Sequence, residues 1–132
     1  WGPLCDRVSG GFWTFVSAVG MAITLGWAAL YLHPDGPSAF RPFLWAMLVM
    51  FFFAGIGNAG TFKQMPMIMP KRQAGGAIGF TAAVACFGPF FVGVALSAMD
   101  AAVWFWICAA YSALCAVICW IRYARPGAPF PG

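Results

Sequence analysis

The chain has 132 residues, of which 63% are hydrophobic and only 8% are charged, and its formal net charge is +4 at pH 7. Because about 25% of the residues in a soluble domain are charged, this composition excludes an ordinary soluble globular fold. The basic residues lie in short gaps between apolar runs and form no continuous stripe, so we expect no nucleic-acid partner.

Four charge-free runs indicate helices that cross a membrane. They cover residues 12–32, 43–62, 74–99 and 101–121. Each run has about 20 residues or more, which at about 1.5 Å per residue crosses a hydrocarbon core of about 30 Å. We therefore predict an all-α membrane protein whose four transmembrane helices, at about 12–32, 42–69, 74–99 and 101–122, occupy residues 1–123. A disordered cytoplasmic tail is expected at 124–132, which is rich in Pro and Gly.

The gaps between the runs predict how the helices are oriented in the bilayer. They are short and carry turn-forming residues, so neighbouring helices should be antiparallel. One face of the bilayer then receives Arg41, and the other receives Arg7, Lys71, Arg72, Arg122 and Arg125. The positive-inside rule places both termini in the cytoplasm, and we expect the cell (inner) membrane as the location.

Small residues and one proline predict how the helices pack. Ala18, Ala22 and Gly26 lie four residues apart in the first run, a spacing typical of close helix contacts in lipid. In the third run, Pro89 follows Gly88. Proline supplies no backbone N–H and clashes with the preceding turn, so we expect a kink there.

The end of the second run, residues 55–66, is the most polar stretch that we place at bilayer depth. Its Asn58, Thr61, Lys63 and three glycines are costly or disruptive in hydrocarbon unless they pack another helix or line a solute path. At about 100° per residue, Asn58 and Thr61 share one helix face with Gly57, whereas Lys63 points roughly 140° away from Asn58. Asn58 and Thr61 can therefore face one cavity.

Each of these residues also has a purely structural interpretation. Asn58 can hydrogen-bond a neighbouring helix, and the Thr61 hydroxyl can bond back to its own helix. Lys63 lies near the expected cytoplasmic end and can extend to the interface instead of meeting a solute in the inner exit. The glycines that can serve close packing or a local kink are Gly55, Gly57 and Gly60.

The same segment resembles a known family signature. Residues 53–66, FAGIGNAGTFKQMP, closely resemble the second nitrate signature of the NarK-type nitrate/nitrite porters of the major facilitator superfamily. The resemblance continues through residues 73–80 and through a Gly- and Phe-rich stretch at 87–93. Residues 2–7, followed by Gly10 and Gly11, are similar to the superfamily's cytoplasmic loop motif. The resemblance implies a C-terminal fragment that forms the last third of a twelve-helix porter, from the loop before the ninth helix.

The function implied by this resemblance is secondary transport of nitrate and/or nitrite by alternating access, with a role in nitrate assimilation. The residues expected to bind the substrate are Asn58, Thr61, Gly57, Gly60, Gly55 and Lys63. The resemblance implies that the arginines that bind the anion lie on the N-terminal helices that this chain lacks. Those missing helices and the lipid bilayer are the expected partners of the chain. Two alternatives stay open: a transporter of another small anion such as formate or oxalate, and a small four-helix scaffold subunit.

Other chemistry has little support in the sequence. Cys108, Cys115 and Cys119 share a helix face, but no histidine accompanies them, so inert packing is the expected role. The four runs contain no Asp or Glu that could relay a proton. We therefore expect no enzyme activity, no cofactor and no metal.

Overall fold

The protein is seen here in a computed structural model that describes residue 3, residues 7–32 and residues 36–129. The elements are α2 (Gly10–Leu30), a short 3-10 helix η1 (Pro37–Ala39), α3 (Phe40–Ile68), α4 (Lys71–Cys86), α5 (Gly88–Ala98), α6 (Ala101–Cys119) and a π-helical turn η2 (Trp120–Ala124). Helices and turns account for the described ranges, in which there is no strand, and the all-α prediction is confirmed. Most of the expected loop motif and the end of the expected tail lie outside the described residues.

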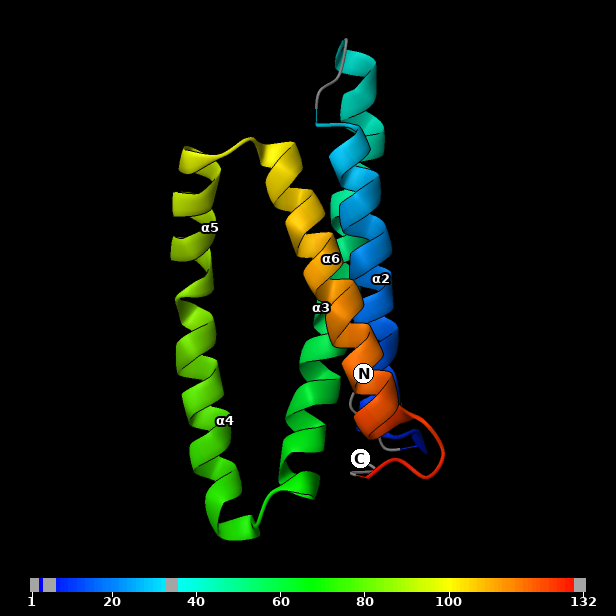
Figure 1. Cartoon of the computed structure of the whole chain (residues 1–132), viewed down its shortest axis with the longest axis vertical. Helices are drawn as coiled ribbons and strands as arrows, with labels where there is room; N and C mark the ends of the chain where they lie inside the picture. The colour runs from blue at the N-terminus through cyan, green and yellow to red at the C-terminus, as the bar shows by residue number, and fades with distance from the viewer. Residues whose placement is uncertain (1–2, 4–6, 33–35, 130–132) are drawn as a thin grey trace.

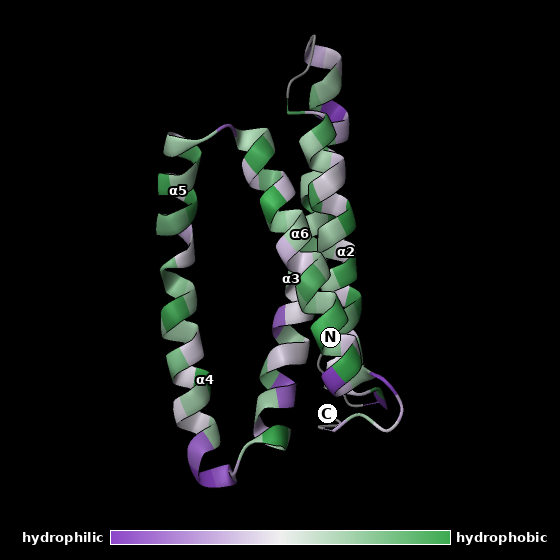
Figure 2. Cartoon of the chain, viewed as in Figure 1, coloured by the Kyte–Doolittle hydropathy of each residue, from purple (hydrophilic) through white to green (hydrophobic). Residues whose placement is uncertain are grey.

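Four segments are long and apolar enough to cross a membrane, as the sequence predicted. They are Gly10–Leu30, Pro37–Ile68, Lys71–Ala98 and Ala101–Ala124. Figure 2 shows hydrophobic residues over most of their length and hydrophilic residues where α3 meets α4. The first three helices begin at Gly10, Phe40 and Lys71, two or three residues before the charge-free runs indicated. Charged and polar residues can occupy a helix end at the membrane interface, so apolar runs underestimate helix length.

Two of the helix starts are capped by a side chain. Ser9 accepts a hydrogen bond from the backbone N–H of Phe12 at 3.1 Å before α2, and Asp100 accepts one from Ala102 at 2.8 Å before α6. Such caps satisfy donors that the first helical turn leaves unpaired, and they fix where each helix enters the membrane.

Helices α2, α3 and α6 pack side by side, with α2 in contact with both others (Figure 1). The face of α2 that meets α3 contains Ser17 and Gly20. A methyl group added at Gly20 would collide with the ring of Phe53, so only glycine allows this approach. On α6, the buried residues are the small side chains Ala109, Ser112, Ala116 and Cys119. Close backbone contact therefore holds the three-helix unit together.

Helices α4 and α5 form a separate arm beside that unit (Figure 1). The chain leaves the helical pattern at Phe87 and resumes with Gly88, and Pro89 occupies the first turn of α5. Because Pro89 has no N–H to offer the preceding turn, the break lies where the kink was expected. Most of the arm is exposed, including Phe80, Phe90 and Phe91. Such apolar surface suits contact with lipid or with further helices.

A hydrogen bond from Ser17 joins α2 to α3 directly, and it yields a stability prediction. The Ser17 hydroxyl donates to the backbone carbonyl oxygen of Phe53 at 2.6 Å, and Ser17 is buried. Ser17→Ala should lower the free energy of unfolding by about 0.6 kcal/mol, a typical value for such bonds in membrane proteins. The measurement is unfolding of the full-length protein in mixed detergent and SDS. Ser97→Ala is the matched control, since that hydroxyl bonds within its own helix to Val94, and an equal loss in both variants would contradict the prediction.

Candidate functional site

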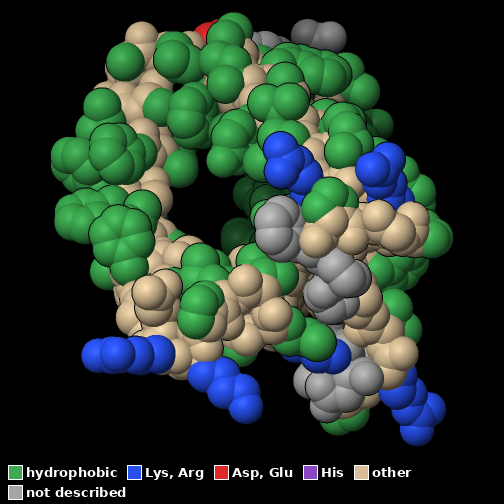
Figure 3. Space-filling view, turned by 60° about the horizontal axis from the view of Figure 1, so that its bottom comes forward, with side chains coloured by type: hydrophobic (Ala, Val, Ile, Leu, Met, Phe, Trp, Pro, Cys, Tyr) green, Lys and Arg blue, Asp and Glu red, His purple; other side chains and the backbone are tan. Residues whose placement is uncertain are grey.

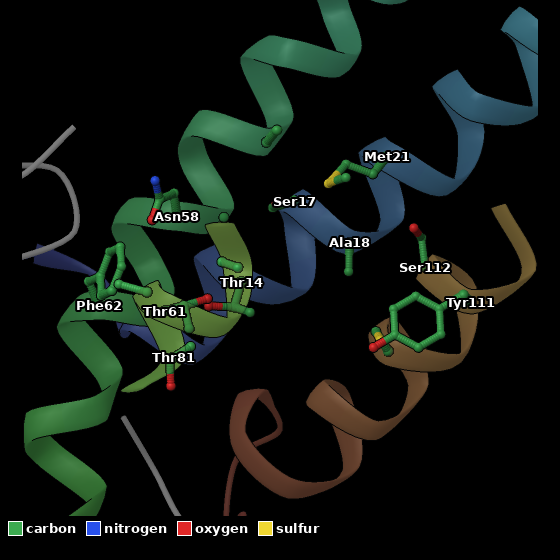
Figure 4. Close-up of a pocket in the computed structure, with 15 residues that line it drawn as sticks. Thr14, Ser17, Ala18, Met21, Asn58, Thr61, Phe62, Thr81, Tyr111 and Ser112 are labelled. Carbon is green, nitrogen blue, oxygen red and sulfur yellow. The ribbon is translucent and has the colours of Figure 1, made fainter. Parts of the chain in front are cut away.

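A cavity of about 390 Å³ lies between α2, α3, α4 and α6 (Figure 4). Its wall consists of Thr14, Ser17, Ala18, Met21, Ala54, Gly57, Asn58, Thr61, Phe62, Thr81, Ala82, Ala85, Tyr111, Ser112 and Cys115. None of these lining residues is charged. Hydroxyl groups and one amide thus stand on an otherwise apolar wall, a composition typical of small-molecule sites.

The polar segment of α3 supplies the amide of this cavity. The helix runs without interruption through residues 55–66, and it brings Asn58 and Thr61 onto the cavity wall together with Gly57. Figure 4 shows Asn58 and Thr61 of α3 as sticks, and Thr61 faces Thr14 of α2. The predicted shared face of Asn58 and Thr61 is therefore present in the structure, because three residues of regular helix separate them.

Some polar groups on the cavity wall already donate a hydrogen bond within the protein, whereas others do not. Thr14 donates to the carbonyl oxygen of Gly10 at 2.9 Å, and Ser17 donates to that of Phe53. Within the described part of the chain, no hydrogen bond engages the Asn58 amide or the hydroxyls of Thr61 and Thr81. Those groups can donate to a solute or to water in the cavity. A wall with uncommitted donors and no negative charge is chemically suited to an anion.

The other predicted site residues lie elsewhere on α3. Gly60 is buried against α2, where an added methyl would come within 2.9 Å of the Thr14 hydroxyl. Gly55 has open space around its Cα, with nothing within 4 Å of an added methyl. Lys63 is half-buried and is not part of the cavity wall, in keeping with its predicted direction. Direct contact of Gly55, Gly60 and Lys63 with a substrate stays a prediction.

Several cavity residues were not among those selected from the sequence. They are Thr14 and Ser17 of α2, Thr81 of α4, and Tyr111 and Ser112 of α6. Hydroxyl residues are common in transmembrane helices because they can bond to their own backbone, so their presence alone is a weak signal. Only the arrangement of the helices in space shows that these particular hydroxyls face one cavity.

Charge is distributed unevenly along the molecule. In the space-filling view of Figure 3, Lys and Arg side chains are spread over the end of the molecule that comes forward, which includes the turn between α3 and α4, and hydrophobic side chains lie beside the hollow. Lys71 and Arg72 open α4 at that end. Among residues 7–32 and 36–129, Asp100 is the one acidic side chain, and it lies at the turn between α5 and α6. The resulting positive potential at the α3–α4 end favours anions.

Comparison with known proteins identifies a relative that covers nearly the whole chain. The chain is 44% identical over 135 residues to the probable nitrate/nitrite antiporter NarK2 of Thermus thermophilus, in an alignment that covers 98% of this chain and 30% of the relative. This chain thus spans less than a third of the length of the curated relative it matches. No protein-family model matches, and no solved structure matches. The resemblance to NarK-type porters that the signature indicated is confirmed.

Proposed function

We propose that this chain, which resembles a NarK-type porter over nearly its whole length, forms part of a secondary transporter of nitrate and/or nitrite. The observation that carries the proposal is the cavity wall on which the signature residues Asn58 and Thr61 stand together, without a charged neighbour. The name of the Thermus relative supports the class of substrate. In this proposal the chain is one side of a substrate path, and helices of a longer protein complete it.

The chemistry of the ions fits the groups on the wall. Nitrate and nitrite are planar, carry one negative charge and are weakly hydrated, so they need hydrogen-bond donors more than a group that accepts a proton. The Asn58 amide offers two N–H donors, and the hydroxyls of Thr61 and Thr81 offer one each. Neutral donors hold an anion without trapping it, which a transport cycle requires. Arginines supplied by the rest of the transporter would provide the countercharge.

We further propose alternating access, in which the two halves of the full transporter rock around the anion. The positive end at Lys71 and Arg72 is then cytoplasmic, in the cell membrane, by the positive-inside rule. The break at Phe87 gives the arm of α4 and α5 a place to bend during such a motion.

The experiment that tests the function is a flux assay with the full-length transporter in proteoliposomes. Uptake of nitrate is measured with internal nitrite, with an imposed pH gradient and with neither. We expect exchange of nitrate for nitrite or coupling to protons, and formate or oxalate should compete poorly. Strong competition by formate or oxalate would reassign the substrate. Absence of any anion flux from correctly inserted protein would favour a scaffold subunit instead.

Replacement of Lys63 is predicted to have only a small effect on nitrate flux. Because Lys63 is not on the cavity wall, its ammonium group should reach the interface, and Lys63→Gln should lower nitrate flux by no more than about twofold. The measurement is initial nitrate uptake normalised to the amount of inserted protein. Complete loss of uptake with normal expression would instead place Lys63 on the inner exit of the anion.

A further inference from the structure

A second cavity adjoins the first, and a buried amide without a partner points to its use. This cavity has a volume of about 300 Å³ and shares Thr14, Thr61 and Cys115 with the larger one. Gln64 stands on its wall and is 6% exposed, and within the described part of the chain its Nε2 group has no hydrogen-bond acceptor. A buried N–H donor without a partner is rare in folded proteins, and it calls for a ligand or a water molecule.

The helix geometry of α3 explains why the two cavities are joined. Asn58, Thr61 and Gln64 follow one another at intervals of three residues, each about 4.5 Å further along the helix and turned by roughly 60°. The progressive turn puts Asn58 on the first cavity alone, Thr61 on both and Gln64 on the second alone. These three side chains form a row of hydrogen-bond donors along α3 that runs toward the α3–α4 end of the molecule.

We propose that Gln64 and Thr61 form a second, weaker subsite for the transported anion, between the main cavity and the positive end of the molecule. This inference rests on the proposed function. The Gln64 amide and the Thr61 hydroxyl donate, whereas Thr14 can only accept because its hydrogen is engaged by Gly10. A subsite of neutral donors binds weakly, so the anion pauses there and moves on toward Lys71 and Arg72.

The rest of the second cavity fits a passage for a small anion. Among the described residues, its remaining wall is Met65, Ile68, Ile118, Cys119 and Tyr123, none of which carries a carboxylate that would repel an anion. Gln64 packs against α2, where added Cβ atoms on Gly10 and Gly11 would lie 3.4 Å from its Cβ and 3.3 Å from its Nε2. The amide is thus presented by packing against α2 and is not free to turn into lipid.

The test compares two substitutions at Gln64 that separate donors from volume. Gln64→Asn keeps both N–H donors but is shorter, whereas Gln64→Met keeps the length and loses the donors. In the full-length transporter, we expect Gln64→Met to lower nitrate/nitrite exchange at saturating substrate by about fivefold to tenfold, and Gln64→Asn by about twofold. Equilibrium nitrate binding in detergent, measured by calorimetry, should change by less than about twofold in both. Met67→Leu, on the same helix but on neither cavity wall, is the matched control and should leave both quantities unchanged.

Each other outcome decides against the subsite. Exchange at the wild-type rate in Gln64→Met would mean that only water occupies the second cavity. Faster exchange in Gln64→Met than in Gln64→Asn would show that packing matters and donors do not. If Gln64→Met is too unstable to purify, Gln64→Leu removes the same donors from a side chain of similar volume and should slow exchange to the same extent, and normal exchange in it would overturn the subsite. A wild-type protein that neither binds nor moves these anions would remove the proposed function itself, whereas a failed subsite leaves wild-type flux intact.

Discussion

Nitrate flux through the full-length transporter should fall at least tenfold when Asn58 is replaced by Ala, while the amount of inserted protein stays unchanged. Asn58 is exposed on the cavity wall, and its amide makes no hydrogen bond within the described part of the chain. A hydrogen bond to a charged group contributes about 1.5–3 kcal/mol, and about 1.4 kcal/mol corresponds to a factor of ten in affinity. The measurement is initial nitrate uptake into proteoliposomes, together with nitrate binding in detergent.

The substitution Asn58→Asp tests more directly whether Asn58 donates hydrogen bonds to the anion. The aspartate has nearly the shape of asparagine, but it replaces two donors by a negative charge that repels an anion. We therefore expect Asn58→Asp to lower flux more than Asn58→Ala, whereas a packing role would rank the two in the reverse order. Uptake at the wild-type rate in Asn58→Ala would remove Asn58 from the substrate path.

The sequence predicted the number of membrane spans well because that property depends on length and apolarity alone. Four long apolar helices are present, and the irregularity at Pro89 lies where the missing N–H required it. Helix ends were less accurate, since residues such as Lys71 remain helical at the interface although they are charged. Periodicity also predicted correctly that Asn58 and Thr61 meet one cavity, because both lie on one regular helix.

Contacts between helices could be predicted only in part. The spacing of small residues selected Ala18, Ala22 and Gly26 on the first helix, yet α3 contacts the neighbouring strip that contains Ser17 and Gly20. Gly26 instead faces Trp106 of α6, at 3.4 Å from an added methyl. A helix with small residues on two faces offers two packing strips, and its own sequence does not say which partner takes which. For the same reason the cavity residues of α4 and α6 were not foreseen.

Gly60 should be a glycine of α3 at which a single methyl group damages the fold, because the backbone of α2 lies directly against it. An added Cβ would come within 2.9 Å of the Thr14 hydroxyl and 3.1 Å of the Gly10 carbonyl oxygen, and an added Cβ on Gly10 would meet the Gly60 carbonyl oxygen at 2.9 Å. The two backbones are thus in mutual contact, and neither can yield without separating the helices. We expect Gly60→Ala to lower the free energy of unfolding by about 1–3 kcal/mol, the usual cost of overpacking.

The control for this prediction lies five residues earlier on the same helix. Gly55→Ala meets nothing within 4 Å, so it should leave the free energy of unfolding unchanged or raise it slightly through the higher helix propensity of alanine. Both variants are measured by SDS unfolding of the full-length protein, with nitrate flux recorded in parallel. Separation of α2 from α3 at Gly60 also moves Thr14 away from Thr61, and both residues line the two cavities, so flux should fall along with stability. Equal stability of the two variants would show that α2 and α3 are less tightly packed in the membrane than the Gly10–Gly60 contact requires.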